Sequence, residues 1–412
     1  MADAVRELKF RDPARAALLA AKLTRTVAEI GRSPVSVMHV CGSHEQAIAR
    51  YGLRSAFPKD LHVIMGPGCP VCITDQPEVD EAVALARQGV RVATYGDMVR
   101  VPGTSASLAD VQAEGARIEV VYSIVQALDL ARSSPDPLVF FATGFETTAV
   151  ATAAAILDRP PSNFFVLSAH KYIPPVMEIV AEMPDSRIEG FLAAGHAATI
   201  TGWGVFEQFV ARHGVPVVVA GFEPLDILAA LVRLVELVRD RRSAVENMFP
   251  RCVSREGNLP AQRRLWQVFR PIGGRWRGIA HVPNGNLRLR DDWAHVDARR
   301  HFAIDLAALW DAAPSPLSQQ CICGDIMAGL KSPGDCPLFG AECVPDTPVG
   351  ACMVSTEGTC RIWHEYKVVP GPWVPGPESL VAGPSSRVPG PSSQVPGPWS
   401  QLPGSASGGV TP

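Results

Sequence analysis

Short apolar runs alternate with helix-like segments between residues 35 and 240. The runs are rich in Val, Ile and Phe and nearly continuous in hydrophobicity, which is typical of strands buried on both faces of a sheet. Helix-like segments such as 76–89 and 224–240 lie between them. This alternation predicts an α/β fold with parallel sheets covered by helices on both faces. The predicted strands are 35–40, 61–65, 91–95, 118–122, 138–142, 164–168, 191–194 and 215–221.

The strand count and local composition suggest how the chain divides. Eight strands fit two small sheets better than one, although the pattern also allows a single mixed sheet. The segment SSPDP (133–137) is the predicted boundary, which gives two α/β domains over residues 1–135 and 136–245. A third domain is predicted over 246–368, where an Arg- and Trp-rich stretch precedes six of the ten cysteines. Residues 369–412 repeat V-P-G-P at irregular spacing, a composition that cannot bury a core, and are predicted to be disordered.

Composition and charge exclude several classes of protein. The 412 residues are 47% hydrophobic and 19% charged, enough to bury a sizeable core. A net charge of −3 gives no electrostatic reason to expect nucleic acid or an anionic membrane as a partner. No apolar run reaches the ~20 residues of a membrane helix, and the N-terminus lacks the features of a signal peptide. We therefore expect a cytoplasmic protein, whose cysteines more often serve as metal ligands or redox groups than as structural disulfides.

Residues capable of chemistry follow the predicted strands directly. In open parallel sheets, ligands bind beyond the carboxyl ends of the strands. The sequence CGSHE (41–45) follows the first strand, and GPGCPVC (66–72) follows the second, one strand–helix unit later, which predicts that both motifs lie on one sheet edge. Loops are polar in general, which accounts for the acidic residues here but not for three cysteines, since cysteines as a type prefer burial in cores. Further strand ends carry Asp97, Glu146, His170, Lys171, His196 and Glu223.

Cys41 is predicted to stand at the start of a helix. The helix dipole and the free N–H groups favour the thiolate at such a position. His44 lies three residues further on, within reach of the same turn. The pair could bind a soft or borderline metal such as Fe(II) or Zn(II), or could form a Cys–His nucleophile pair. A half-buried thiol beside polar helix-start residues explains this stretch alone equally well.

Cys69 and Cys72 form a CxxC motif that precedes a helical segment. In redox proteins with this arrangement, the first thiol is exposed at the helix start. The preceding Gly-Pro-Gly supplies a turn with unusual dihedral angles. Two cysteines provide only half of a tetrahedral zinc site, so dithiol–disulfide chemistry is favoured over zinc. The glycines match no Walker or GxGxxG pattern, and phosphate binding is therefore only weakly indicated.

Six cysteines lie within 40 residues near the C-terminal end, spaced C-x-C-x12-C-x6-C-x8-C-x7-C. In a chain without a secretion signal, this density indicates a metal centre. Four thiolates suffice for a [4Fe–4S] cluster or an all-cysteine zinc site, and the lack of paired CxxC knuckles disfavours a zinc ribbon. The two surplus cysteines suggest a disulfide beside an iron–sulfur cluster. Cys252 stands alone and is predicted to be structural.

Taken together, these motifs resemble those of the HypD family, hydrogenase formation proteins that help to assemble the iron centre of [NiFe] hydrogenases. The resemblance implies two Rossmann-like α/β domains followed by a cluster domain. WAHVDARRHF (293–302) departs from the Glu/Tyr-rich stretch usual in the family, and the tail after about residue 368 has no counterpart. The matching stretches are CGSHE (41–45), GPGCPVC (66–72), YGDMVRVPG (95–103), GFETT (144–148), GFEPLD (221–226) and the block 321–360.

The resemblance implies a metallocentre-assembly scaffold more than a turnover enzyme. With a small HypC-like chaperone, such a protein holds Fe(II) while CO and two cyanides are attached, and the hydrogenase large subunit is served indirectly. The cyanide comes from a thiocyanate on a HypE-like protein. Cys41 would bind the iron with His44 beside it, and Cys69 and Cys72 would be the nearby thiol pair.

The cysteine block is similar to that of ferredoxin:thioredoxin reductase, in which a [4Fe–4S] cluster abuts a redox disulfide. This resemblance implies that Cys323 and Cys352 form the disulfide and that the cluster ligands are Cys321, Cys336, Cys343 and Cys360.

Cyanide release from a thiocyanate is formally a two-electron reduction. A cluster passes one electron at a time, and a dithiol stores two. We therefore expect a relay from the cluster through Cys323–Cys352 and Cys69–Cys72 to iron at Cys41. Two other classes are a stand-alone iron–sulfur thiol–disulfide reductase and a nucleotide-binding module, the latter disfavoured by the missing glycine fingerprint.

Overall fold

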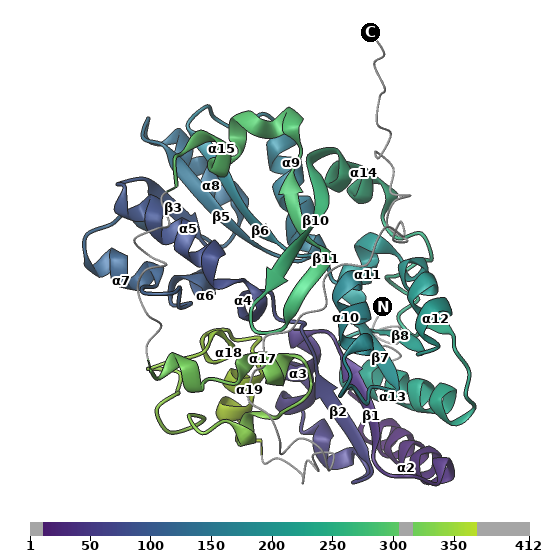
Figure 1. Ribbon diagram of the computed structural model, residues 1–412. Coiled ribbons are helices and arrows are strands. Elements are labelled where there is room, and N and C mark those ends of the chain that lie inside the picture. Colours follow the sequence, from purple (N-terminus) through teal and green to yellow (C-terminus); the bar gives the residue numbers. More distant parts are fainter. Residues whose placement is uncertain (1–10, 305–315, 369–412) are drawn as a thin grey trace.

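All eight predicted strands are present, and they lie in two parallel sheets. The computed structural model of the protein describes residues 11–304 and 316–368 (Figure 1). Every residue of the two longest of these eight strands is buried, as their continuous apolar runs predict. The strands are β1 (Val35–His39), β2 (Leu61–Met65), β3 (Arg91–Thr94), β4 (Ile118–Val120), β5 (Leu138–Gly144), β6 (Phe164–His170), β7 (Gly190–Ala194) and β8 (Val217–Ala220).

The order of the strands differs from the predicted division of the chain. One sheet has the order β2-β1-β7-β8-β9, where β9 is Val245–Asn247, and the other has the order β4-β3-β5-β6. The predicted boundary at 133–137 does not separate the sheets, because β3 pairs with β5 across it. The first sheet therefore takes strands from both 1–135 and 136–245. Its β1–β7 pairing joins segments far apart in sequence, for which no local pattern provides a signal.

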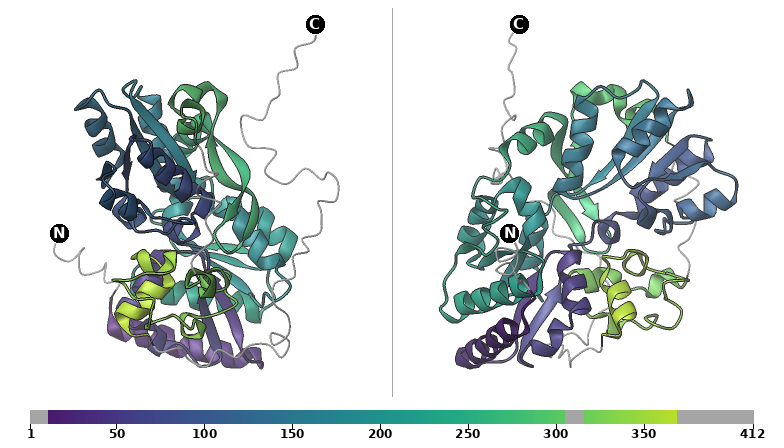
Figure 2. Two further views of the ribbon diagram at one scale, coloured as in Figure 1. Left: turned by 60° about the vertical axis from the view of Figure 1, so that its left-hand side comes forward. Right: turned by 180° about the vertical axis from the view of Figure 1, so that it is seen from behind.

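Helices cover both faces of each sheet, as the alternating pattern predicts (Figures 1 and 2). In the first sheet, apolar residues pack against α2, α3 and α13 on one face and against α10 to α12 on the other. In the second sheet, α5 and α7 cover one face and α8 and α9 the other. The helices predicted at 76–89 and 224–240 are confirmed as α5 (Gln76–Arg87) and α13 (Pro224–Arg239).

The remaining helices are mostly short, and several begin within a few residues after a strand. They are α2 (Pro13–Ile30), α3 (Gly42–Arg50), α4 (Pro70–Ile73), α6 (Gly96–Val99), α7 (Leu108–Ala113), α8 (Ile124–Arg132), α9 (Glu146–Leu157), α10 (Pro174–Glu182), α11 (Gly195–Thr201), α12 (Glu207–His213), α14 (Leu259–Val268), α15 (Ala298–His301), α17 (Cys323–Met327), α18 (Ala351–Val354) and α19 (Thr359–Tyr366).

A hairpin of β10 (Phe269–Trp276) and β11 (Ala280–Leu289) is the main element that the sequence pattern did not predict. Its strands contain Pro, Gly and Arg, and only the two ends of β10 are buried, so the apolar alternation is broken. β11 lies against the second sheet, where Ser168 donates a hydrogen bond to Leu287 O at 2.7 Å. At the other end of the hairpin, Arg277 N donates to Ile73 O at 3.1 Å. The hairpin therefore links the second sheet to the CxxC segment.

The C-terminal block 316–368 is built from loops and short helices and lies beside α3 and α4 (Figures 1 and 2). Polar contacts fix it there: Ser43 donates to the Glu357 carboxylate at 2.9 Å, and Asp97 accepts hydrogen bonds from Ser355 and Thr356. The tail predicted to be disordered, 369–412, lies outside the described residues. The block therefore covers the edge of the first sheet at which the candidate residues lie.

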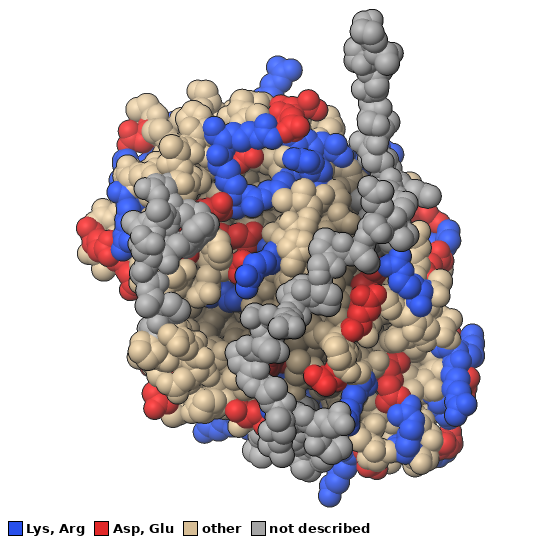
Figure 3. Space-filling model, viewed as in Figure 1, with Lys and Arg blue, Asp and Glu red and all other residues tan. Residues whose placement is uncertain are grey.

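Two structural features relate to the membrane and nucleic-acid-binding classes that the composition disfavours: the character of the helices and the distribution of surface charge. Among the described helices, none combines the length and the apolar character needed to cross a membrane. Figure 3 shows acidic and basic side chains mixed over the face in view, with basic ones gathered where α15 and the upper part of the hairpin lie. Two of the arginines there, Arg299 and Arg300, pair with Glu81 and Asp291. The local excess of positive charge is thus partly neutralised within the chain.

Candidate redox and metal-binding site

Cys41 and the CxxC motif lie side by side because their strands are neighbours. β1 and β2 pair in parallel, so both deliver their following loops to the same edge of the sheet. Cys41 is the N-cap of α3, and Cys69 is the N-cap of α4. Gly42 N donates a hydrogen bond to Gly68 O at 3.1 Å, which joins the two loops directly. The predicted meeting of the two motifs at one sheet edge is confirmed.

Gly68 is required by the closeness of these loops. A Cβ atom at this position would lie 2.1 Å from Cys41 N and 2.4 Å from Cys41 Cα. Because these are backbone atoms, no side-chain rotation could relieve the clash. The Gly-Pro-Gly turn thus allows the CxxC loop to touch the backbone of Cys41.

We expect Gly68→Ala to lower the free energy of unfolding by about 3 kcal/mol or more, as overpacking against fixed atoms does. Urea unfolding measures this change. Gly96→Ala is the matched control, because a Cβ there would meet Val120 at an ordinary 3.5 Å. Its effect should stay within about 0.5 kcal/mol. Equal losses in the two variants would contradict the close-contact explanation.

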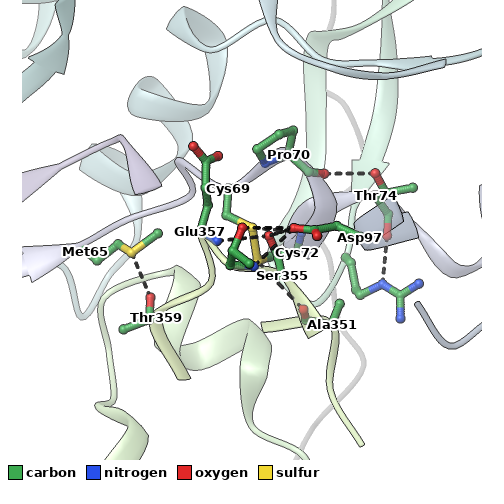
Figure 4. The surroundings of a disulfide bond; sticks show 12 residues. Met65, Cys69, Pro70, Cys72, Thr74, Asp97, Ala351, Ser355, Glu357 and Thr359 are labelled. Carbon is green, nitrogen blue, oxygen red and sulfur yellow. Dashed lines mark hydrogen bonds between the residues drawn. A yellow bond between two sulfur atoms is a disulfide. The ribbon is translucent and has the colours of Figure 1, made fainter. Parts of the chain in front are cut away.

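Cys69 and Cys72 form a disulfide bond, in agreement with the favoured dithiol–disulfide interpretation (Figure 4). The expectation that the first thiol is exposed is wrong, since both residues are buried. Figure 4 shows the reason: the disulfide is enclosed by residues of the C-terminal block, including Ala351, Ser355 and Glu357. The distance from Cys72 Sγ to Ala351 O is 4.0 Å. Ala351 directly precedes Cys352, so the block brings a second thiol segment against the CxxC motif.

Two histidines flank Cys41. His44 is fully buried and donates from Nε2 to Gly221 O at 3.0 Å, while its Nδ1 has no partner among the described residues. His196 places Nδ1 3.9 Å from Cys41 Sγ. His196 was noted only as one of several strand-end residues, because its place beside Cys41 depends on the pairing of β7 with β1. His196 therefore lies close to the thiol, and His44, whose pKa His196 helps to lower, keeps one ring nitrogen without a hydrogen bond.

Burial controls the protonation of this site. It raises the pKa of the Cys41 thiol to about 12, and the nearby Glu357 carboxylate acts in the same direction. The helix-start effect on the thiolate is thus outweighed, although the amides of His44 and Ser43 do oppose the shift. Burial also lowers the pKa of His44 to about 3 and that of His196 to about 4. The site holds a neutral thiol beside neutral imidazoles, and binding of a metal ion would release the thiol proton.

The six cysteines of the C-terminal block line one cavity. All six are free thiols, so the disulfide that the resemblance implied between Cys323 and Cys352 is not formed in this structure. The two are nevertheless in contact: hydrogen bonds from Cys321 and Cys352 hold the pKa of Cys323 well below its usual value. The same contact raises the pKa of Cys352. The cavity is lined by Cys321, Cys323, Cys336, Cys343, Cys352 and Cys360, together with Ile326, Phe339, Gly350 and Met353.

The chemistry of this cavity fits an iron–sulfur cluster. Its potential ligands are all soft thiols, and a [4Fe–4S] cluster takes four of them. Within residues 11–304 and 316–368, no three His, Cys, Asp or Glu side chains converge closely enough to hold a single metal ion. A cubane cluster binds each thiolate through a different iron atom, so its ligands need not converge on one point. The arrangement is therefore better suited to a cluster than to one structural zinc ion.

Arg277 connects the cavity to the CxxC segment, and sequence reasoning missed it together with its hairpin. Its guanidinium donates to Thr74 O at 2.7 Å and to Pro102 O at 2.8 Å. Burial lowers its pKa, whereas the nearby Cys323 acts in the opposite direction. The hairpin turn thus contacts the CxxC segment and lies close to the cysteine pocket.

Glu146, from the motif GFETT, lies at the edge of the second sheet. It is fully buried; Oε1 accepts a hydrogen bond from Ile173 N at 2.9 Å, and Oε2 has no partner among the described residues. Burial raises its pKa to about 7. Its hydrogen bond is to the backbone that leads into α10, so the structure gives it no direct role at Cys41.

We expect Glu146 to make stability depend on pH. The folded protein keeps this proton up to about pH 7, whereas the unfolded chain loses it near 4.5. Stability should therefore fall by roughly 3 kcal/mol as the pH rises from 4.5 to 7, and Glu146→Gln should remove this part of the loss. Urea unfolding of both proteins at pH 5 and pH 8 measures the difference. Parallel pH profiles for the two proteins would contradict it.

The fold and the site define an α/β thiol–disulfide protein in which a lone thiol, a buried disulfide and a cysteine-lined pocket lie together. The family model of HypD, described as the hydrogenase formation hypA family, matches residues 15–367. The chain therefore belongs to the HypD family.

Curated relatives agree with this assignment. Hydrogenase maturation factor HypD of Azotobacter vinelandii is 40% identical over 370 residues, covering 87% of this chain and 96% of that protein. HypD2 of Bradyrhizobium diazoefficiens is 42% identical over 371 residues, with the same coverage. HypD of Cupriavidus necator is 40% identical over 372 residues, again covering 87% and 96%. All three relatives are named hydrogenase maturation factors.

Proposed function

We propose that this protein is a [NiFe] hydrogenase maturation factor that holds Fe(II) while CO and cyanide are attached. It would act with a HypC-like chaperone, receive cyanide from a HypE-like thiocyanate and serve the hydrogenase large subunit indirectly. The membership of the HypD family and the names of the relatives support a role in hydrogenase maturation. One observation carries the mechanism: the Cys41 loop touches the disulfide loop, which in turn touches the cysteine block.

Cys41 is the proposed iron ligand on this chain. Its thiol is buried with the neutral His196 imidazole beside it, and a thiol with an imidazole nitrogen suits a borderline cation such as Fe(II). His44 and His196 either bind the iron or accept the proton that Cys41 releases. The remaining positions around the iron are left to the partner and to the diatomic ligands.

The Cys69–Cys72 pair is the proposed reductant for cyanide release. Two thiols give up two electrons and two protons as the disulfide forms, and the thiocyanate R–S–C≡N is cleaved to R–SH and HCN. This balances atoms and electrons in one step. Burial of the pair keeps unrelated disulfides away from it, which favours this role over that of a stand-alone reductase.

The cysteine pocket is the proposed source of reducing equivalents. Cys321, Cys336, Cys343 and Cys360 would hold a [4Fe–4S] cluster, which when bound supplies single electrons. Cys323 and Cys352 lie in contact and would form the dithiol that reduces Cys69–Cys72 by exchange. The carbonyl oxygen of Ala351, which precedes Cys352, lies 4.0 Å from Cys72 Sγ, and this closeness supports exchange between the two pairs.

The test is anaerobic co-purification with the HypC-like partner, followed by infrared spectroscopy. We expect bands of iron-bound CO and cyanide in the complex and none with Cys41→Ser. A complex of the unmodified chain without such bands would contradict the proposal. Reduction of generic disulfides by the protein alone would instead support the stand-alone reductase.

A further inference from the structure

Glu45, the last residue of the CGSHE motif, is a buried carboxylate for which the proposed chemistry has no use. It is fully buried and accepts hydrogen bonds from three side chains. His39 Nε2 lies 2.9 Å from it, Arg54 Nη2 lies 2.6 and 2.7 Å from its two oxygens, and Trp363 Nε1 lies 2.7 Å away. Burial alone would raise the pKa of Glu45, but Arg54 and His39 lower it well below its usual range. The group is therefore a fully partnered anion.

The partners of Glu45 lead in two directions. His39 also contacts Cys41 O through Nδ1 at 3.0 Å, so one side of the network reaches the turn that carries the proposed iron ligand. Trp363 lies three residues after Cys360 on α19, so the other side reaches the helix that lines the cysteine pocket. A continuous hydrogen-bonded path thus joins Cys41 to the C-terminal block.

We propose that Glu45 is a positioning residue that fastens α19 to the turn carrying Cys41. The proposal rests on the proposed function, in which Cys41 binds iron. Cys41 and the disulfide are both buried, and the C-terminal block covers them: Glu357 accepts a hydrogen bond from Ser43 of the Cys41 turn, and Ala351 and Ser355 lie beside the disulfide (Figure 4). Iron and thiocyanate therefore reach the site only when this contact opens. The buried Glu45 carboxylate is stable only with all of its hydrogen-bond donors in place, so the closed arrangement of the C-terminal block is the favoured one. The block therefore returns to this arrangement after each opening.

The surroundings of the network suit such a fastening. The Arg54 guanidinium lies over the Trp363 ring at 5.2 Å and donates to Val63 O at 3.0 Å, so it supports the ring and the edge strand β2 together. Arg54 and Trp363 also line a pocket of about 410 Å³ that is open to solvent. The contact therefore has water on one side, where it can begin to separate, and the proposed reaction site on the other.

The test is alkylation of Cys41 in the folded protein, followed by mass spectrometry at increasing urea below the unfolding transition. Trp363→Phe removes the N–H donor and keeps an aromatic, although smaller, ring, and Glu45→Gln removes the charge. We expect both substitutions to raise the rate of Cys41 alkylation about tenfold, because this factor corresponds to the loss of one hydrogen bond to a charged group. The rate should depend little on urea, because the opening is local. Trp293→Phe is the control: it makes the same substitution at a tryptophan that packs against the core of the second sheet and removes its hydrogen bond to Gln267 O at 3.1 Å.

Each outcome is decisive. Wild-type rates in Trp363→Phe overturn the proposal, and this variant decides the matter if Glu45→Gln does not fold. A rise that Trp293→Phe shares, or one with the urea dependence of global unfolding, also overturns it. The exposed Cys252 serves as an internal reference whose rate stays constant. The alkylation assay needs neither iron nor a partner. Missing infrared bands in the wild-type complex would therefore contradict the proposed function and leave the proposal for Glu45 standing.

Discussion

Replacing Cys69 or Cys72 by alanine should abolish the infrared bands of iron-bound cyanide and leave the visible absorbance of the iron–sulfur cluster intact. Either substitution removes the disulfide, and with it the store of two electrons next to Cys41. The cluster should survive because the cysteine pocket contains neither residue. The measurement is infrared and visible spectroscopy of the anaerobic complex with the HypC-like partner.

Cys252→Ala is the matched control for these variants. Cys252 is a free, exposed cysteine outside the site, so its loss should leave both spectra unchanged. Normal cyanide bands in both Cys69→Ala and Cys72→Ala would exclude the pair as the reductant. Loss of cluster absorbance together with the bands would instead show that the pair acts through the fold of the cysteine block.

The sheet edge at which the site lies could be predicted from sequence for a simple reason. β1 and β2 are consecutive and both are marked by continuous apolar runs, so their following loops are placed together without knowledge of the whole sheet. This was enough to bring Cys41 and the CxxC motif to one place. The two motifs are one strand–helix unit apart along the chain. On neighbouring parallel strands, this spacing alone predicts that they lie close together in space.

The parts of the site that were missed depend on contacts distant in sequence. His196 approaches Cys41 only because β7 inserts beside β1, and the predicted division of the chain at 133–137 would have placed β7 elsewhere. Glu357 and Trp363 reach the site from the C-terminal block, more than 300 residues after Cys41. No local periodicity encodes these approaches.

Electrostatic predictions from sequence failed for a related reason. A thiol at a helix start is expected to have a lowered pKa, yet that of Cys41 is raised to about 12. The helix-start position was identified correctly, whereas the burial that opposes it comes from the C-terminal block and from the neighbouring strands. Local sequence predicts local fields, but desolvation depends on everything that packs against the group.

Serine substitutions in the cysteine block should divide its six cysteines into two classes. We expect loss of a ligand, at Cys321, Cys336, Cys343 or Cys360, to reduce iron from about four atoms per chain to near zero. Cys323→Ser and Cys352→Ser should retain the iron and lose cyanide attachment. The measurement is iron and acid-labile sulfide per anaerobically purified chain, with Cys252→Ser as the control.

Two contacts support this division. Val349 N donates to Cys343 Sγ at 3.4 Å, and an amide aimed at a sulfur stabilises the thiolate form that a cluster requires. Cys323 and Cys352 are in contact with each other, which suits a pair that alternates between dithiol and disulfide. Full iron content in any one of the four ligand variants would move that cysteine out of the ligand set. Loss of iron in Cys323→Ser or Cys352→Ser would leave the CxxC motif as the only redox pair of the site.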